Sequence, residues 1–364
     1  GYMYSGMADV AAITGDSSYV RAIDRIWENI VGKKIYITGG IGARHEGEAF
    51  GDNYELPNLT AYNETCAAIG NVYTNYRLFL LHGDAKYFDV LERTLYNGLI
   101  SGVSLDGGRF FYPNPLACDG KYRFNADHTI TRQPWFGCAC CPSNISRFIP
   151  SLPGYVYAVK DDKVYVNLFL SNRAKLKVNG KNVVLEQETS YPWNGDIRLT
   201  VAKGNQPFVM NVRIPGWVRG SVLPGGLYSY ADGEELAYRV SVNGQEVKGA
   251  LQKGYLSIDR HWKKGDVVEI HFDMQPRVVK ANDKVAANRG RVAIEHGPLV
   301  YCAEWPDNDF DISTLLLNRH PKFQVVEHPD LLGGINEITT RAQALSYDAT
   351  GRLAAKDVKL TLIP

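Results

Sequence analysis

The sequence has no excess of charge of either sign, because its 364 residues contain 40 Lys+Arg and 39 Asp+Glu, a net charge of +1. This balance excludes a broad basic surface of the kind that binds nucleic acid or anionic lipid. No stretch approaches the roughly 20 consecutive apolar residues of a membrane span, so no membrane partner is expected. Low-complexity tracts and repeats of fixed period are also missing. The remaining composition, 45% hydrophobic and 22% charged, is typical of a globular protein of two or three domains.

The two ends of the chain have the character of internal segments. Residues 2–13 read as a helix already in progress, with no basic and apolar leader in front of it. Residues 358–364 alternate like a β-strand and stop without a turn. We therefore expect the chain to be the interior and later part of a longer protein, with any targeting signal upstream.

Residues 1–152 are predicted to be helical. Apolar residues recur with the 3.6-residue period between Ser17, a predicted N-cap, and Gly32, a predicted helix end. A second helix is expected to close at Gly83, and a third to start after Asp84. This part of the chain is therefore expected to form a helical domain.

After residue 153 the hydrophobic period changes from 3.6 to 2, which predicts β-strands. Asn179-Gly180 and Asn243-Gly244 each lie between apolar runs, as hairpin turns of the primed type do. Several such runs with turn signals between them are typical of β-sandwiches. We expect one sandwich over residues 153–275 and a second over residues 276–364.

Two long Gly-rich loops without periodicity, residues 38–62 and 102–142, interrupt the helical part. Connections of this length are uncommon inside a compact helical domain, and ordered ones tend to hold function. Within the first loop, residues 47–58 offer three carboxylates among aromatic residues, those of Glu48, Asp52 and Glu55. A carboxyl group that aromatic rings shield from water suits a general acid, although a solvated acidic loop is the commoner case. A lone loop histidine such as His45 is more often neither ligand nor base.

Three of the six cysteines lie in one short tract, at Cys138, Cys140 and Cys141. Adjacent cysteines seldom reach disulfide geometry, so Cys140 and Cys141 are not expected to join each other. Three interpretations remain: a redox pair of Cys138 with Cys141, a buried structural trio, or thiolate ligands of a soft metal. We expect Cys118 and Cys302 to have no part in the chemistry.

The other half of a metal site could come from Glu64 and Cys66. Positions i and i+2 face different sides of a regular helix, so these two side chains can converge only where a helix begins. We predict that Asn63 is the N-cap that places them there. With Cys140 and Cys141 they would offer one oxygen and three sulfurs, a tetrahedral set suited to zinc. The alternative is that Glu64 complements the helix dipole and Cys66 is a small core residue.

Three further motifs carry weaker signals. Tyr112 lies in the aromatic motif Phe110-Phe111-Tyr112-Pro113-Asn114-Pro115. Its hydroxyl could contact a substrate, or the side chain could simply be buried at a rigid turn. The motifs Ile214-Pro215-Gly216-Trp217 and Glu295-His296-Gly297-Pro298 are interpreted as turns and sheet packing.

Together these motifs resemble the β-L-arabinofuranosidases of glycoside hydrolase family 127. Short motifs occur by chance, but this ordered set does not readily do so. The motifs that carry the resemblance are Met7-Ala8-Asp9-Val10-Ala11, Gly47-Glu48-Ala49-Phe50, Tyr54-Glu55-Leu56-Pro57-Asn58, Tyr62-Asn63-Glu64-Thr65-Cys66-Ala67, Phe111-Tyr112-Pro113-Asn114-Pro115, Cys140-Cys141-Pro142-Ser143-Asn144, Arg213-Ile214-Pro215-Gly216-Trp217 and Glu295-His296-Gly297-Pro298-Leu299-Val300-Tyr301.

The resemblance implies a retaining exo-glycosidase that releases terminal β-linked L-arabinofuranose through a thioglycosyl-cysteine intermediate. By motif, the zinc ligands are Glu64, Cys66, Cys140 and Cys141, the nucleophile is Cys140, and the acid/base is Glu48. Tyr112 is an added candidate for a sugar contact.

The same resemblance implies a multidomain α-then-β fold, in which the later part of an (α/α)6 barrel precedes β-sandwich domains. An incomplete barrel would expose an apolar face, so pairing with a second copy is also expected. The competing hypothesis is a carbohydrate-binding protein with a structural zinc, since closed Cys-rich sites are ordinarily structural. The cysteine usage fits the cytoplasm and the periplasm equally, because a bound metal protects thiolates in both.

Overall fold

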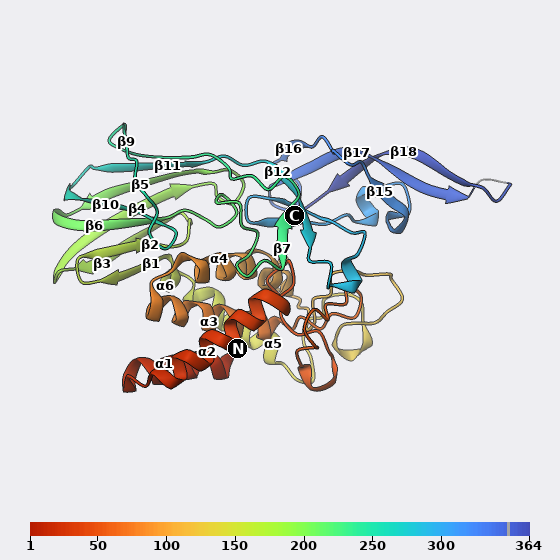
Figure 1. The fold of residues 1–364 in the computed structure, drawn as a ribbon, viewed down its shortest axis with the longest axis horizontal. Helices are drawn as coiled ribbons and strands as arrows, with labels where there is room; N and C mark the ends of the chain where they lie inside the picture. The colour runs from red at the N-terminus through yellow and green to blue at the C-terminus, as the bar shows by residue number, and fades with distance from the viewer. Residues whose placement is uncertain (348–349) are drawn as a thin grey trace.

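The computed structural model describes residues 1–347 and 350–364, and it has helices first and sheets afterwards, as expected. Figure 1 shows the helices gathered below, with strands β1 to β6 and β8 to β11 above them on one side, β7 and β12 in the middle, and strands β15 to β18 extending to the other side. Within the described residues, none of the helices combines the length and the apolar character that crossing a bilayer takes.

The helices occupy the first 156 residues and are connected by the two long loops. They are α1 (Tyr2–Thr14), α2 (Ser17–Lys33), α3 (Thr65–His82), α4 (Ala85–Arg93), α5 (Cys140–Phe148) and α6 (Pro153–Val156), with a π-helical segment η2 (Thr94–Leu99) and the short 3-10 turns η1 (Glu46–Glu48), η3 (Ile100–Gly102), η4 (Ala126–His128) and η5 (Ile149–Ser151).

Two of the predicted helix boundaries are correct. The third helix starts after Asp84, whose side chain accepts a hydrogen bond from the backbone N–H of Lys86, and Gly83 ends α3 in the left-handed conformation.

The predicted ends of α2 are wrong. Asp16, not Ser17, is the N-cap and accepts from the backbone N–H of Ser18. At the other end the helix runs through Gly32 to Lys33. Both boundaries are wrong by only one or two residues. At the start, two neighbouring polar residues can each serve as the cap, and at the end a glycine is tolerated inside the helix.

The strands of the described residues form four sheets. The first sheet has the order β1-β2-β6-β10, and the second has the order β3-β4-β5-β11-β8-β9. Their strands are β1 (Tyr157–Lys160), β2 (Lys163–Val166), β3 (Asn172–Val178), β4 (Lys181–Thr189), β5 (Asp196–Lys203), β6 (Asn205–Arg213), β8 (Tyr238–Val242), β9 (Gln245–Glu246), β10 (Tyr255–Lys263) and β11 (Val267–Phe272). The third has the order β14-β13-β12-β7, and the fourth the order β15-β17-β16 with β18 paired to β17; they contain β7 (Tyr228–Tyr230), β12 (Pro276–Ala281), β13 (Ala293–His296), β14 (Leu299–Tyr301), β15 (Leu315–Leu317), β16 (Gln324–His328), β17 (Ile335–Tyr347) and β18 (Leu353–Leu362). Three short 3-10 turns, η6 (Ala286–Asn288), η7 (Trp305–Asp307) and η8 (Ile312–Thr314), lie between the later strands.

Both predicted hairpin turns are present. Asn179 and Gly180 have φ values of 49° and 75°, and they join β3 to β4. Asn243 and Gly244, at 52° and 78°, join β8 to β9 in the same way. Positive φ at both central residues defines the primed turn that matches strand twist, which is why Asn-Gly is favoured there.

The first sheet packs against helix α3. The ring of Phe79, near the end of α3, lies 5.7 Å from the ring of Tyr165 on β2 and 6.3 Å from that of Tyr255 on β10. One continuous cluster of buried apolar residues runs from the helices into the first two sheets. This packing holds α3, at whose start two of the predicted metal ligands lie.

A buried charge network joins helix α4 to the sheets. Arg213, at the end of β6, is fully buried and pairs with Asp89 (Nη1 to Oδ1, 3.0 Å) and with Glu92 on α4. The next residue of α4, Arg93, pairs with Glu295 of β13 at 2.7 Å. Arg219 also pairs with Asp89, at 2.6 Å. The two motifs interpreted as turns and sheet packing therefore also lie where the sheets meet the helical part. We call Asp89, Glu92, Arg93, Arg213, Arg219 and Glu295 the α4 junction.

Candidate metal centre

The four predicted ligands come from the starts of two helices. Glu64 is the N-cap residue of α3, Cys66 lies in its first turn, and α5 begins at Cys140. The predicted N-cap Asn63 is therefore wrong: it precedes the cap with φ of 38°, and its side chain makes no capping bond. The start of each helix leaves side chains free to converge because its first turn is unfinished.

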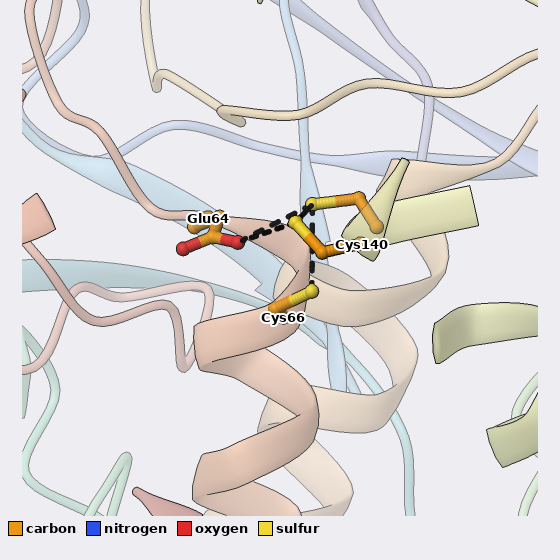
Figure 2. A group of neighbouring side chains, drawn as sticks. Glu64, Cys66 and Cys140 are labelled. Carbon is orange, nitrogen blue, oxygen red and sulfur yellow. Dashed lines mark hydrogen bonds between the residues drawn. The ribbon is translucent and has the colours of Figure 1, made fainter. Parts of the chain in front are cut away.

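The ligand atoms of these residues lie within 4.8 Å of one another. The Sγ of Cys141 is 3.6 Å from that of Cys66 and 3.9 Å from that of Cys140. One carboxylate oxygen of Glu64, Oε1, is 3.6 Å from Cys140 Sγ and 3.4 Å from Cys141 Sγ. Figure 2 shows Glu64, Cys66 and Cys140 pointing toward one another.

These separations match the edges of a zinc tetrahedron. With Zn–S bonds of about 2.3 Å and a Zn–O bond of about 2.1 Å, tetrahedral angles give S···S edges of about 3.8 Å and S···O edges of about 3.6 Å. A disulfide would bring two sulfurs to about 2.05 Å. All six cysteines are free, so the donor set has the composition and the spacing of a soft-metal site.

The cluster collects acidic groups without a positive partner. Glu64, Cys66 and Cys141 are buried, and within residues 1–347 and 350–364 no hydrogen bond or ion pair joins the four ligands to Lys, Arg or His. Burial, reinforced by nearby Glu48, raises the pKa of Glu64. Burial also raises the pKa of the Cys140 thiol to about 12. A bound dication reverses this tendency, because it stabilises the deprotonated donors.

The geometry does not support the two other interpretations of the cysteine tract, a redox pair of Cys138 with Cys141 and a buried structural trio. Cys138 is exposed and its Sγ lies 3.9 Å from the hydroxyl of Tyr112, whereas Cys141 is fully buried and contacts Cys66 and Glu64. Cys66 is itself part of the cluster, so it is not a plain core residue. Cys118 and Cys302 lie outside the cluster.

Of the three loop carboxylates, only that of Glu48 faces the cluster. Arg44 binds both oxygens of Glu55, with Nε to Oε1 at 2.8 Å, and also reaches Asp52 at 3.2 Å. Hydrogen bonding to Arg44 lowers the pKa of Glu55 to about 2, so that group is a fixed anion. Glu48 makes no ion pair among the described residues, and its Oε1 accepts hydrogen bonds from two tyrosine hydroxyls.

Tyr112 lies between Glu48 and the cluster. Its hydroxyl oxygen is 2.9 Å from Cys140 Sγ and 3.4 Å from Oε1 of Glu48. The ring is 8% exposed and meets Phe136 edge to face at 5.8 Å. A predicted nucleophile and a predicted acid/base are thus separated by a single hydroxyl group.

Tyr62 is a polar residue that the sequence interpretation missed. Its hydroxyl donates a hydrogen bond to Oε1 of Glu48 at 2.9 Å. His45, which lies outside the cluster, meets this ring at a steep angle, with the ring centroids 5.0 Å apart. The signal was present in the same motif as Glu64, but nothing in the spacing shows that the side chain turns back toward the preceding loop.

Models of the three domains of one family match nearly the entire chain. Residues 2–154 match the β-L-arabinofuranosidase GH127 catalytic domain, residues 163–274 the GH127 middle domain, and residues 276–364 the glycoside hydrolase family 127 C-terminal domain. The chain belongs to glycoside hydrolase family 127. The resemblance seen in the sequence motifs is therefore confirmed.

Several relatives in this family are similar over the whole chain. A non-reducing end β-L-arabinofuranosidase of Bifidobacterium longum subsp. longum is 36% identical. The structure of a GH127 β-arabinofuranosidase is 74% identical with a TM-score of 0.96, and that of a GH127 β-L-arabinofuranosidase from Geobacillus stearothermophilus T6 is 39% identical with a TM-score of 0.91. All three alignments cover 100% of this chain, which spans 56% of the length of each relative.

Proposed function

We propose that the whole protein is a retaining exo-glycosidase that hydrolyses terminal β-L-arabinofuranosides of an oligosaccharide or small glycoside. The observation that carries this proposal is the alignment of Cys140, Tyr112 and Glu48, with steps of 2.9 and 3.4 Å between their polar atoms. These short steps support a sulfur nucleophile and a proton donor that act on the same glycosidic bond. The names of the relatives supply the sugar.

We propose zinc as the cofactor, held by Glu64, Cys66, Cys140 and Cys141. The fit rests on the donor set and its tetrahedral spacing. Zinc, when bound, keeps the thiols deprotonated at neutral pH, and the thiolate is the attacking form of cysteine. Cys140 is the half-buried member of a set that is otherwise buried, so its sulfur is the one a substrate can reach.

The reaction divides into two displacements. The Cys140 sulfur forms a bond to the anomeric carbon while the bond to the glycosidic oxygen breaks, and Glu48 gives its proton to that oxygen. Water then attacks the same carbon, Glu48 takes a proton from it, and the carbon–sulfur bond breaks. Two inversions at one carbon give net retention. Tyr112 lies where it can contact the sugar.

We propose the following domain assignment for this mechanism. Residues 1–152 form the later part of an (α/α)6 barrel, residues 153–275 one β-sandwich and residues 276–364 a second. The concentration of the helices in the first 156 residues and the turn to strands at Tyr157 support it. Pairing of two copies remains a prediction.

A second candidate function follows from the completeness of the donor set. Four protein ligands fill a tetrahedron, and closed sites with three thiolates are ordinarily structural. The protein would then bind carbohydrate without turning it over.

Two substitutions in the whole protein separate these functions. Cys140→Ala removes the nucleophile, and we expect the rate of release of an aryl β-L-arabinofuranoside to fall by at least about a thousandfold. Glu48→Gln leaves all four donors in place, so we expect full zinc content, slow turnover, and a pentosyl unit trapped on the peptide that contains Cys140, detected by mass spectrometry. Unaltered turnover in either variant rejects the role of that residue, and an inactive wild type with full zinc supports the binding protein.

A further inference from the structure

We propose that Tyr62 is a positioning residue that holds one oxygen of Glu48, Oε1, so that the other oxygen, Oε2, carries the proton transferred in the reaction. The inference rests on the proposed function and assigns a task to a residue outside the cluster. It also distinguishes the two oxygens of the acid/base.

Two tyrosine hydroxyls converge on the same oxygen of Glu48. Tyr62 Oη is 2.9 Å from Oε1, and Tyr112 Oη is 3.4 Å from it. Among the residues that the structure describes, none makes a hydrogen bond to Oε2. One oxygen is therefore occupied by donors, and the other is open.

A hydroxyl that donates to a carboxyl oxygen requires a lone pair there. In the protonated acid the carbonyl oxygen offers that lone pair, so the acidic hydrogen resides on the opposite oxygen. In the carboxylate both oxygens accept, and the same bond persists. The contact from Tyr62 can thus remain in place while Glu48 acts first as acid and then as base.

Glu48 needs such a support because its own surroundings restrain it little. It is exposed and lies in the turn η1, where Gly47 and Glu48 have positive φ values of 70° and 49°. The base of this turn is closed by paired backbone hydrogen bonds between Arg44 and Ala49. These bonds fix the backbone, but they leave the Glu48 side chain free to rotate.

Tyr62 is well placed to restrain it. Its side chain is 7% exposed, and its backbone carbonyl accepts a hydrogen bond from the N–H of Asn114 at 3.1 Å. It also lies two residues before Glu64, so it is tied to the start of α3 and hence to the cluster. A rigid residue next to the proposed metal ligands thus sets where the flexible carboxylate points. A misplaced acid slows proton transfer much more than it weakens binding.

The test compares two leaving groups in the whole protein. A 4-nitrophenolate departs with little help from an acid, whereas a methoxide requires protonation. We expect Tyr62→Phe to lower kcat/KM, which reports the first displacement, by about 10- to 100-fold more for methyl β-L-arabinofuranoside than for the 4-nitrophenyl glycoside. Zinc content is expected to remain unchanged. A general loss of structure would lower both rates equally, so the ratio reports proton transfer.

A matched control is Tyr54→Phe, in the same loop. The ring of Tyr54 faces Lys284, whose Nζ is 5.3 Å from its centroid, and it makes no contact with Glu48 among the described residues. We expect its ratio of rates to equal that of the wild type.

Equal losses for the two substrates in Tyr62→Phe, or no loss, would overturn the inference. Glu48→Gln separates this failure from failure of the proposed function. If that variant shows the dependence on leaving group and Tyr62→Phe does not, only the role of Tyr62 is wrong. If the wild type hydrolyses neither glycoside, both proposals are wrong.

Discussion

Two polar clusters of this protein differ in charge balance: one pairs its charges, and the other consists of acidic groups alone. At the α4 junction three arginines, Arg93, Arg213 and Arg219, meet three carboxylates, Asp89, Glu92 and Glu295. In the cluster of Glu64 and three cysteines, no described Lys, Arg or His is paired with any member.

The difference indicates which cluster needs a partner from outside the chain. A buried charge is tolerated when it is paired and hydrogen-bonded, and the junction satisfies this condition by itself. Four acidic groups side by side either keep their protons or receive a cation. The α4 junction therefore joins helix to sheets without outside help, and the cysteine cluster is the one that could hold a metal ion.

The largest expected effect comes from removing a donor of the cluster. We expect Cys141→Ala to lose most of its zinc and to lower the rate of arabinofuranoside hydrolysis by at least about a thousandfold, because it removes a ligand and leaves Cys66 without its partner. The zinc content is measured by mass spectrometry, and the activity is measured as the initial rate of hydrolysis.

The matched control is Cys118→Ala, since Cys118 is exposed and lies outside the cluster. It is expected to keep both zinc and activity. Full zinc content in Cys141→Ala would remove the contrast between the two clusters.

The second effect is on stability and belongs to the junction. Arg213→Met leaves Asp89 and Glu92 buried without their main partner, and we expect the free energy of unfolding to fall by about 3–5 kcal/mol. Denaturation by urea measures the change, and zinc content per folded chain is expected to remain that of the wild type. A change below about 1 kcal/mol would show that the junction is not held by its charges.

The smallest effect is expected at an exposed ion pair. Arg198 on β5 and Glu269 on β11 lie opposite each other, 2.7 Å apart, with side chains 48% and 52% exposed. Arg198→Ala should change the free energy of unfolding by less than about 1 kcal/mol, because water and salt screen the pair. An effect as large as that of Arg213→Met would mean that burial does not explain why the α4 junction stabilises the fold more than an exposed ion pair does.

Local features were predictable from the sequence, and contacts between distant residues were less so. The change of hydrophobic period and both Asn-Gly turns indicate the order of helices and hairpins directly, because they depend on neighbouring residues. Helix caps are also local, yet Ser17 and Asn63 were wrong as N-caps by one position. A polar residue on either side of the boundary can supply the same hydrogen bond.

The cysteine cluster and the α4 junction differed in how they could be found from the sequence. Glu64 and Cys66 were paired with Cys140 and Cys141 because the residue types have metal chemistry, although 76 positions separate Glu64 from Cys140. The pairing of Arg213 with Asp89, 124 positions away, gave no such signal. Ordinary charged residues have many alternative partners, and only the topology of the fold selects among them.

Zinc K-edge X-ray absorption of the purified whole protein tests the central assignment most directly. The account predicts one zinc per chain, with three sulfur neighbours at about 2.3 Å and one oxygen neighbour at about 2.0–2.2 Å. A shell of nitrogen and oxygen atoms alone, or a fully active protein without zinc, would contradict it.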